Sequence, residues 1–233
     1  MLTETLRRMA DGRGGVIGVE PGLVIEPDDS WTPVTELTRE PYTLLNELIA
    51  ETAARWNAPH HVGAALFWKT YGYWHTLPMA LGWALDGRVP VMRFADTYVR
   101  TSGAGVTIAA TRVRWSSGAG AIAEALAEAQ APLVRVIGAV AKVGERTLWG
   151  STAEAVAHPL TVVTSGDYMR LLKEIGPPLD GLVEPAGDGY VRRTCCLWIT
   201  LPDAEPCRTC CVLRPRPAAR PAARPAASAR PRS

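Results

Sequence analysis

The chain has 233 residues, of which 47% are hydrophobic and 21% are charged, and its formal net charge is +2. This length is enough for one substantial core, or for one domain with a small appendage. The last twenty residues contain six arginines and no acidic residue, so the other 213 residues carry a formal charge of −4. A nucleic-acid-binding domain concentrates positive charge on a folded face, so this distribution argues against a nucleic-acid partner.

The first 35 residues predict a short helix followed by loosely extended segments, because Gly and Pro recur after residue 12. Residues 1–15 lack the apolar core of about 7–15 residues that marks a secretory signal. We expect a cytoplasmic protein, with peripheral attachment at the inner face of the membrane as a further option.

Apolar residues at helical spacing predict a series of helices along the chain. Pro41 suits the first position of the first strong helix. The most apolar window, 63–85, contains Lys69, His75 and Pro78, so it predicts a buried helix kinked at the proline and not a membrane span. Gly144 and Gly150 are candidate points of division within the fourth helical stretch. The predicted helices cover residues 40–57, 61–85, 118–131, 132–158 and 167–176.

Two regions predict strands. Residues 89–115 are rich in β-branched residues and predict two strands joined by a turn at Ser102-Gly103 and Gly105. From Leu182 the pattern is extended again, with Asp188-Gly189 as a hairpin-type turn. The expected fold class is α+β, a mainly α-helical body with a small β segment and a C-terminal cysteine-rich module.

The C-terminal tail repeats an Arg-Pro-Ala-Ala unit and predicts disorder, because it buries too little apolar surface to offset the entropy of ordering. Two roles of the tail remain open. It is either a low-complexity extension without a function or a segment weakly attracted to anionic lipid or another polyanion. The expected organisation is therefore a body at 1–182, a module at 183–213 and the tail at 214–233.

All the cysteines lie within one short segment, as Cys195, Cys196, Cys207, Cys210 and Cys211. In a reducing compartment such density is seldom a disulfide framework, and closely spaced thiolates most often hold a metal. Two kinds of centre are compatible with these cysteines: a tetrahedral zinc ion and an iron–sulfur cluster. Adjacent cysteines fit the usual zinc knuckles poorly, because neighbouring side chains on an extended strand point to opposite faces. The cysteine spacing favours an iron–sulfur cluster but does not exclude zinc.

The stretch "YVRRTCCLWITLPDAEPCRTCCVL" resembles the C-terminal signature of the FhuF-like ferric siderophore reductases. Residues 64–85 are similar to that family's aromatic central helix, and residues 146–157 to its Trp-containing helix. The resemblance implies a [2Fe–2S] cluster in a small C-terminal iron–sulfur module. The ligands that it implies are Cys195, Cys196, Cys207 and Cys210, with Cys211 outside the set.

The activity implied by the resemblance is one-electron reduction of Fe(III) in a ferric siderophore, since Fe(II) binds the hard oxygen donors far more weakly. A cluster near the surface can deliver the electron, so no catalytic side chain beyond it is expected. Arg192 and Arg193 are candidates to tune its potential, because positive charge favours the reduced form; a solvated strand face is the alternative role. The expected partners are the ferric siderophore and an electron donor, a ferredoxin or a flavin reductase, with weak association with the membrane surface or a permease.

Two other functional classes remain as alternatives. One is a non-enzymatic binding protein whose four cysteines hold structural zinc. The other is a thiol redox protein that uses Cys207 and Cys210 as a C-x-x-C pair.

Several weaker signals are interpreted as structural. Gly118, Gly120 and Ala123 match a dinucleotide fingerprint in spacing, but the preceding strand alternates with polar residues, so a Gly-rich helix entry is expected. The histidines at positions 60, 61, 75 and 158 have no ligand partner at suitable spacing. The tryptophans are mostly core by spacing, with one or two as candidates for a siderophore-docking surface.

Overall fold

The computed structural model describes residues 1–12, 17–102 and 105–213, and the tail predicted to be disordered lies outside these residues. The fold is α+β, with small sheets and a C-terminal cysteine-rich stretch, as predicted. The α-helices of the described residues are α1 (Leu2–Asp11), α2 (Thr43–Arg55), α3 (His60–Asp86), α4 (Gly118–Ala125), α5 (Ala131–Ala141), α6 (Glu145–Pro159) and α7 (Tyr168–Ile175). Two π-helical turns, Leu126–Gln130 and Leu160–Thr164, continue α4 and α6. Short 3₁₀ turns occupy Val34–Thr38, Phe94–Asp96, Trp198–Thr200 and Cys211–Leu213.

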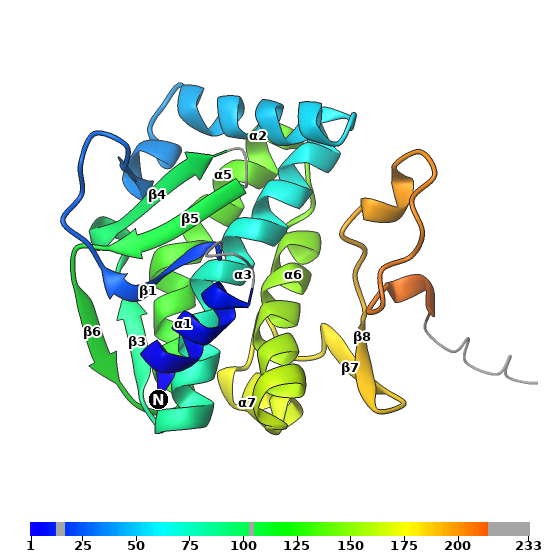
Figure 1. Ribbon diagram of the computed structural model, residues 1–233. Helices are drawn as coiled ribbons and strands as arrows, with labels where there is room; N and C mark the ends of the chain where they lie inside the picture. Colours follow the sequence, from blue (N-terminus) through cyan, green and yellow to red (C-terminus); the bar gives the residue numbers. More distant parts are fainter. Residues whose placement is uncertain (13–16, 103–104, 214–233) are drawn as a thin grey trace, which may run out of the picture.

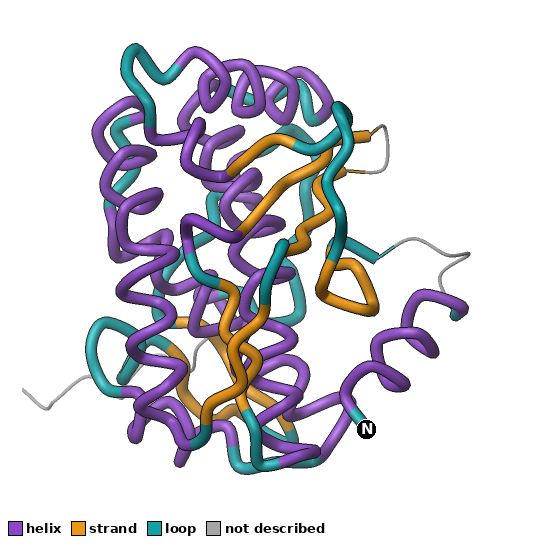
Figure 2. The backbone as a smooth tube through the Cα atoms, turned by 90° about the vertical axis from the view of Figure 1, so that its left-hand side faces the viewer, coloured by secondary structure: helices purple, strands orange, loops and turns teal. Residues whose placement is uncertain are grey.

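Within the described ranges, the strands form three small sheets. The largest has the order β1 (Val19–Val24), β5 (Gly105–Ala110), β4 (Thr97–Ser102) and β2 (Thr32–Pro33); its β1–β5 pair is parallel and its other pairs are antiparallel. The other two sheets are antiparallel pairs: β3 (Val89–Met92) with β6 (Val113–Ser116), which are separated in the chain by β4 and β5, and the hairpin of β7 (Val183–Ala186) with β8 (Gly189–Arg192). Figure 2 shows the four-stranded sheet and the β3–β6 pair in front of the helices of the body.

The long helix α3 is the centre of the molecule. It lies between the four-stranded sheet and α6, and α2 packs across its N-terminal half (Figure 1). Phe67, Trp68 and Tyr71 are buried along it, and Trp68 Nε1 donates a hydrogen bond to the Leu148 carbonyl on α6 at 2.9 Å. Residues 63–85 therefore form a buried helix, as predicted. In the described part of the chain no helix has the length and apolar character needed to cross a membrane.

Several local predictions were wrong at the level of single residues. Pro41 precedes the helix; Tyr42, with φ +64°, is the N-cap, and α2 begins at Thr43. The hairpin turn is formed by Gly187 and Asp188, since Ala186 pairs with Gly189 and Gly187 takes the positive φ of +54°.

The segment 89–115 holds four strands or parts of strands in place of two. The polar interruptions at 93–96 and 111–112 break the extended backbone, and Asp96 accepts hydrogen bonds there from Thr111. Residue 103, which is part of the turn predicted for the segment 89–115, lies outside the described residues.

The helical stretch 132–158 divides before Glu145, and Gly144 is the N-cap of α6. Gly150, the other candidate, lies within α6 against Thr194 of the cysteine-rich stretch. A Cβ at position 150 would collide with the Thr194 side chain, so the absence of a side chain lets the two segments meet.

The cysteine-rich stretch after β8 is irregular and packs on the outer side of α3 and α6 (Figure 1). Leu201 is buried against Val62 and Leu66 of α3. Trp198 makes an edge-to-face contact with Trp56, with ring centroids 4.9 Å apart. These apolar contacts hold the stretch on the body at one end, and polar contacts hold it at the other.

Candidate cysteine-rich metal centre

The two cysteine-bearing segments are held together by the backbone. The amide of Arg192, the last residue of β8, donates to the Thr209 carbonyl at 2.9 Å, so the segments before and after the loop lie side by side. The Cys210 amide donates to the Cys207 carbonyl at 2.9 Å and closes a tight turn. None of the five cysteines is in a disulfide. The fold thus gathers five free thiols at the edge of α3 and α6.

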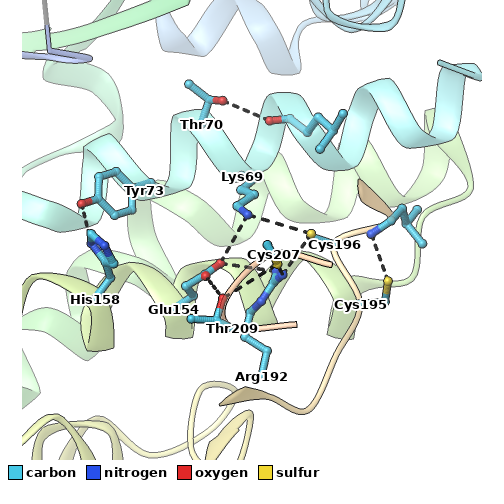
Figure 3. A network of polar contacts seen from close by, with 12 residues as sticks. Lys69, Thr70, Tyr73, Glu154, His158, Arg192, Cys195, Cys196, Cys207 and Thr209 are labelled. Atoms are coloured by element: carbon cyan, nitrogen blue, oxygen red, sulfur yellow. Dashed lines mark hydrogen bonds and ion pairs between the residues drawn. The ribbon is translucent and has the colours of Figure 1, made fainter. Parts of the chain in front are cut away.

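The first group of sulfurs is formed by Cys196 and Cys207 around the Arg192 guanidinium. Arg192 Nη2 donates to Cys196 Sγ at 3.0 Å and to Cys207 Sγ at 3.1 Å (Figure 3). Lys69 Nζ approaches Cys196 Sγ at 4.0 Å from α3. The Arg192 side chain is 0% exposed, so its donors face the sulfurs and not water.

This environment separates the pKa values of the two thiols. A hydrogen bond from Cys207, together with Arg192 and Lys69, lowers the pKa of Cys196 to about 4 against the opposing effect of burial. The same hydrogen bond and burial raise the pKa of Cys207. In the metal-free protein, Cys196 is therefore the thiolate and Cys207 the thiol that donates to it.

The second group contains Cys195, Cys210 and Cys211. Burial raises the pKa of Cys211 to about 11, with further contributions from the nearby Cys195 and Cys210. Cys195 Sγ also accepts a hydrogen bond from the Leu197 amide at 3.2 Å. Cys211 thus lies beside two of the expected ligands, and its place outside the ligand set stays a prediction.

The two sulfur groups allow a test of which metal centre the residues fit. In the described residues, no three His, Cys, Asp or Glu side chains converge on one position suited to a metal ion. A single tetrahedral zinc ion needs four donors around one point. A [2Fe–2S] cluster needs two cysteines at each of two irons. Cys196 with Cys207 would supply one such pair, and two of Cys195, Cys210 and Cys211 the other, so the sulfurs fit the second requirement in number and in grouping.

The charges around the first group also fit an anionic centre. Glu154 of α6 lies between two cations: its Oε2 is 3.4 Å from Arg192 Nη1 and 3.8 Å from Lys69 Nζ. Thr209 donates a short hydrogen bond to the same carboxylate (Figure 3). One carboxylate faces two cations, of which Arg192 is fully buried and Lys69 is partly exposed, so a neighbouring thiolate would balance the remaining positive charge. Arg192 Nε is buried without a hydrogen-bond partner among the described residues.

The two arginines singled out by the sequence have different surroundings. Arg192 contacts the sulfurs directly. Arg193 forms an ion pair with Glu184 of β7 at 3.5 Å and donates to the Gly181 carbonyl at 3.4 Å, and its side chain is 44% exposed. Successive residues at the end of a strand point to opposite faces, which is why only one of the pair reaches the cysteines.

Sequence reasoning missed Lys69, Glu154 and Thr209 as site residues. The sequence contained a signal for Lys69 and Glu154. Each is a charged residue within an apolar helical stretch, and such a charge needs a partner. The sequence did not indicate that Lys69 and Glu154 would pair with each other. They meet because α3 and α6 pack side by side.

The histidines predicted to be structural are in different environments. His75 is fully buried, its pKa is lowered to about 4 by burial, and its Nδ1 lies 3.0 Å from Gln130 Nε2. His60 and His61 are exposed at the start of α3. His158 lies near the site, with Nδ1 2.9 Å from the Tyr73 hydroxyl (Figure 3).

The Gly118, Gly120 and Ala123 spacing, interpreted above as a Gly-rich helix entry, is in a context that does not fit the dinucleotide motif. The strand before Gly118 is β6, which pairs antiparallel with β3. A dinucleotide site needs a strand within a parallel sheet.

Comparison with models of known protein families gave no match to the chain. Comparison with curated proteins gave no match either. The chemistry of the cysteines and of the residues that surround them therefore carries the functional proposal.

Proposed function

We propose that the chain is a ferric siderophore reductase that holds a [2Fe–2S] cluster on Cys195, Cys196, Cys207 and Cys210, as its resemblance to the FhuF-like family implies. The observation that carries the proposal is the buried Arg192 guanidinium, which donates to two cysteine sulfurs at 3.0 and 3.1 Å. Hydrogen bonds to cluster sulfurs and nearby positive charge are means by which proteins set the potential of such a centre.

When bound, the cluster would supply a one-electron carrier, and one electron converts Fe(III) to Fe(II), which hard oxygen donors hold far more weakly. The chain's own residues orient the sulfurs. Arg192 holds Cys196 and Cys207 together, and Glu154 fixes Arg192 through the ion pair at 3.4 Å. Thr209 and Lys69 in turn position Glu154.

The electron comes, in this proposal, from a ferredoxin or a flavin reductase in the cytoplasm. The basic tail would add weak attraction to the anionic inner surface of the membrane or to a permease. Release of iron then requires the ferric complex to reach the edge of α3 and α6, where the cysteines lie.

A second candidate function is thiol–disulfide chemistry, which one observation favours. Cys196, with its pKa lowered to about 4, is hydrogen-bonded to Cys207. Low-pKa thiolates beside a second thiol are typical of redox-active cysteines. This candidate would use Cys196 with Cys207, in place of the Cys207–Cys210 pair of the sequence-based alternative.

Anaerobic purification with metal analysis tests the proposal. Protein that carries a cluster is red-brown, its visible absorption bleaches with dithionite, and the reduced form has an EPR signal. Cys196→Ser should lose the colour, and Cys211→Ser, at the cysteine beside a ligand, should keep it. Colourless protein with stoichiometric zinc would exclude the reductase. Reductase activity that survives complete removal of iron would favour the thiol mechanism.

A further inference from the structure

The second group of sulfurs holds one thiol more than an iron of a two-iron cluster can use. Cys211 shares side-chain hydrogen bonds with Cys195 and Cys210, so the three thiols lie together. In a [2Fe–2S] cluster each iron takes two cysteines, because the bridging sulfides fill its other positions. The first group has two sulfurs, on Cys196 and Cys207, which Arg192 holds together. One thiol of the second group is therefore in excess.

The two pairs of adjacent cysteines are arranged differently in the fold. Cys195 and Cys196 are neighbours in sequence, yet they belong to different sulfur groups. Cys210 and Cys211 belong to the same group. The Cys210 amide bonds back three residues to close a turn, and the 3₁₀ turn Cys211–Leu213 begins directly after it. Successive residues of such a turn are rotated by about 120°, so two neighbouring side chains can face one iron, whereas extended backbone points them to opposite sides.

Cys210 and Cys211 both follow one anchored residue. The Thr209 carbonyl accepts the Arg192 amide at 2.9 Å, which fixes the backbone immediately before Cys210. The side chains of Val212 and Leu213, by contrast, are exposed. The turn that carries Cys211 can therefore rotate at a small cost in buried apolar area.

Cys195 has no such freedom. Thr194, the residue before it, packs closely against Gly150 of α6. Its own sulfur accepts a hydrogen bond from the Leu197 amide at 3.2 Å. A choice between thiols at the second iron therefore concerns Cys210 and Cys211, with Cys195 as the constant ligand.

We propose that Cys211 is a reserve ligand of the second iron, able to take the place of Cys210 beside Cys195. This inference rests on the proposed [2Fe–2S] cluster and names a further residue for it. Cys210 is buried and Cys211 only partly so, so Cys210 is the ligand in the intact chain. The exchange breaks the iron–sulfur bond to Cys210 and forms one to Cys211, and the Cys211 proton passes to the released thiolate. One thiolate replaces another, so the charge and oxidation state of the centre stay the same.

Alanine variants test the proposal, because alanine offers no atom that binds iron. The experiment is anaerobic reconstitution of the full chain with Fe(II) and sulfide, followed by iron and sulfide analysis, visible absorption, and EPR of the dithionite-reduced protein. Cys210→Ala and Cys211→Ala should each keep the cluster. The double variant Cys210→Ala/Cys211→Ala should lose it, because a single thiol then remains at the second iron.

Cys207→Ala is the matched control, since it removes a thiol from the first group, which has no third sulfur, and it should lose the cluster. Alkylation of the reconstituted protein with iodoacetamide, followed by peptide mass spectrometry, then identifies the ligand. Cys211 should be labelled in the wild type and protected in Cys210→Ala, because a thiolate bound to iron is not free to react.

A folded Cys210→Ala protein without iron, with an unfolding midpoint near that of Cys211→Ala, would overturn the proposal. Retention of the cluster with Cys211 still alkylated would overturn it as well. Failure of both Cys210→Ala and the closer isostere Cys210→Ser to fold would count in the same way, since Cys211 could not then replace Cys210.

The outcomes for the reserve ligand and for the function are distinct. Wild-type protein that takes up no iron and sulfide would refute the cluster, and the reductase with it. A coloured wild type together with a colourless, folded Cys210→Ala protein would refute the reserve ligand alone.

Discussion

Glu154 of α6 and Arg192 at the end of β8 form an ion pair in which Oε2 lies 3.4 Å from Nη1, with side-chain exposures of 11% and 0%. This contact joins the helical body to the cysteine-bearing segment. Both charges are removed from water, so each depends on the other and on the sulfurs that share Arg192.

Glu154→Gln is expected to destabilise the metal-free protein by about 3 kcal/mol, because it leaves Lys69 and a buried guanidinium without their carboxylate. Urea unfolding measures the change. Glu174→Gln breaks an ion pair with Arg170 on the surface of α7 and serves as control, with an expected cost below about 0.5 kcal/mol. Equal effects of the two substitutions would mean that the buried pair contributes no more than a surface one.

Stability of the metal-free, reduced protein should rise with pH between about 4 and about 9. The pKa of Cys196 is lowered to about 4 from a usual value near 9, so within that window the unfolded chain binds a proton that the folded chain does not. The stability from this thiolate is complete above the unfolded pKa and is lost as pH falls through the folded pKa. Urea unfolding at several pH values, with reductant and chelator present, gives the slope.

Cys196→Ser is the matched control for this pH dependence, because it removes the titrating group. The wild-type slope should exceed that of the variant by up to about 1.4 kcal/mol per pH unit inside the window. Identical slopes would show that the Cys196 thiol keeps an ordinary pKa in the folded chain.

Arg192→Met should lower the midpoint potential of the proposed cluster. Arg192 donates to two of the cysteine sulfurs, so its positive charge would favour the reduced form by roughly 3 kcal/mol at an effective dielectric constant of about 20, a shift on the order of 100 mV. Arg193→Met should change the potential much less, because its guanidinium is half-exposed and paired with Glu184. Dye-mediated redox titration followed by EPR measures both. A larger shift for Arg193 would reverse the assignment.

Gly150→Ala should displace the cysteine-rich stretch from α6, since the added methyl group meets the Thr194 side chain. The expected cost is about 1–3 kcal/mol, as for other overpacked sites, with a lower yield of coloured protein. Gly120→Ala, in α4 where a Cβ meets no atom within 4 Å, should be neutral or stabilise by about 0.5–1 kcal/mol. Thermal unfolding and visible absorption of the two variants decide the matter.

The helical body could be predicted from the sequence because its signals are local. The periodic apolar residues of 40–57 and 61–85 match α2 and α3 to within a few residues. Lys69, His75 and Pro78 within the apolar window correctly indicated a buried helix. Predictions failed where the outcome depends on one or two residues, as at Pro41 and at the hairpin turn, because helix caps and tight turns are set by single φ angles.

The features of the candidate site were likewise predictable only where they depend on local sequence. Covalent spacing along the chain guarantees that five cysteines lie close together and that two arginines precede them. The division of the sulfurs into two groups, and the choice of Arg192 over Arg193 to face them, follow from the packing of the folded chain. The packing of α3 on α6 brings Lys69 to Glu154 and Cys196, and Glu154 to Arg192. A charge in an apolar helix finds its partner through contacts between segments distant in sequence, which no local pattern specifies.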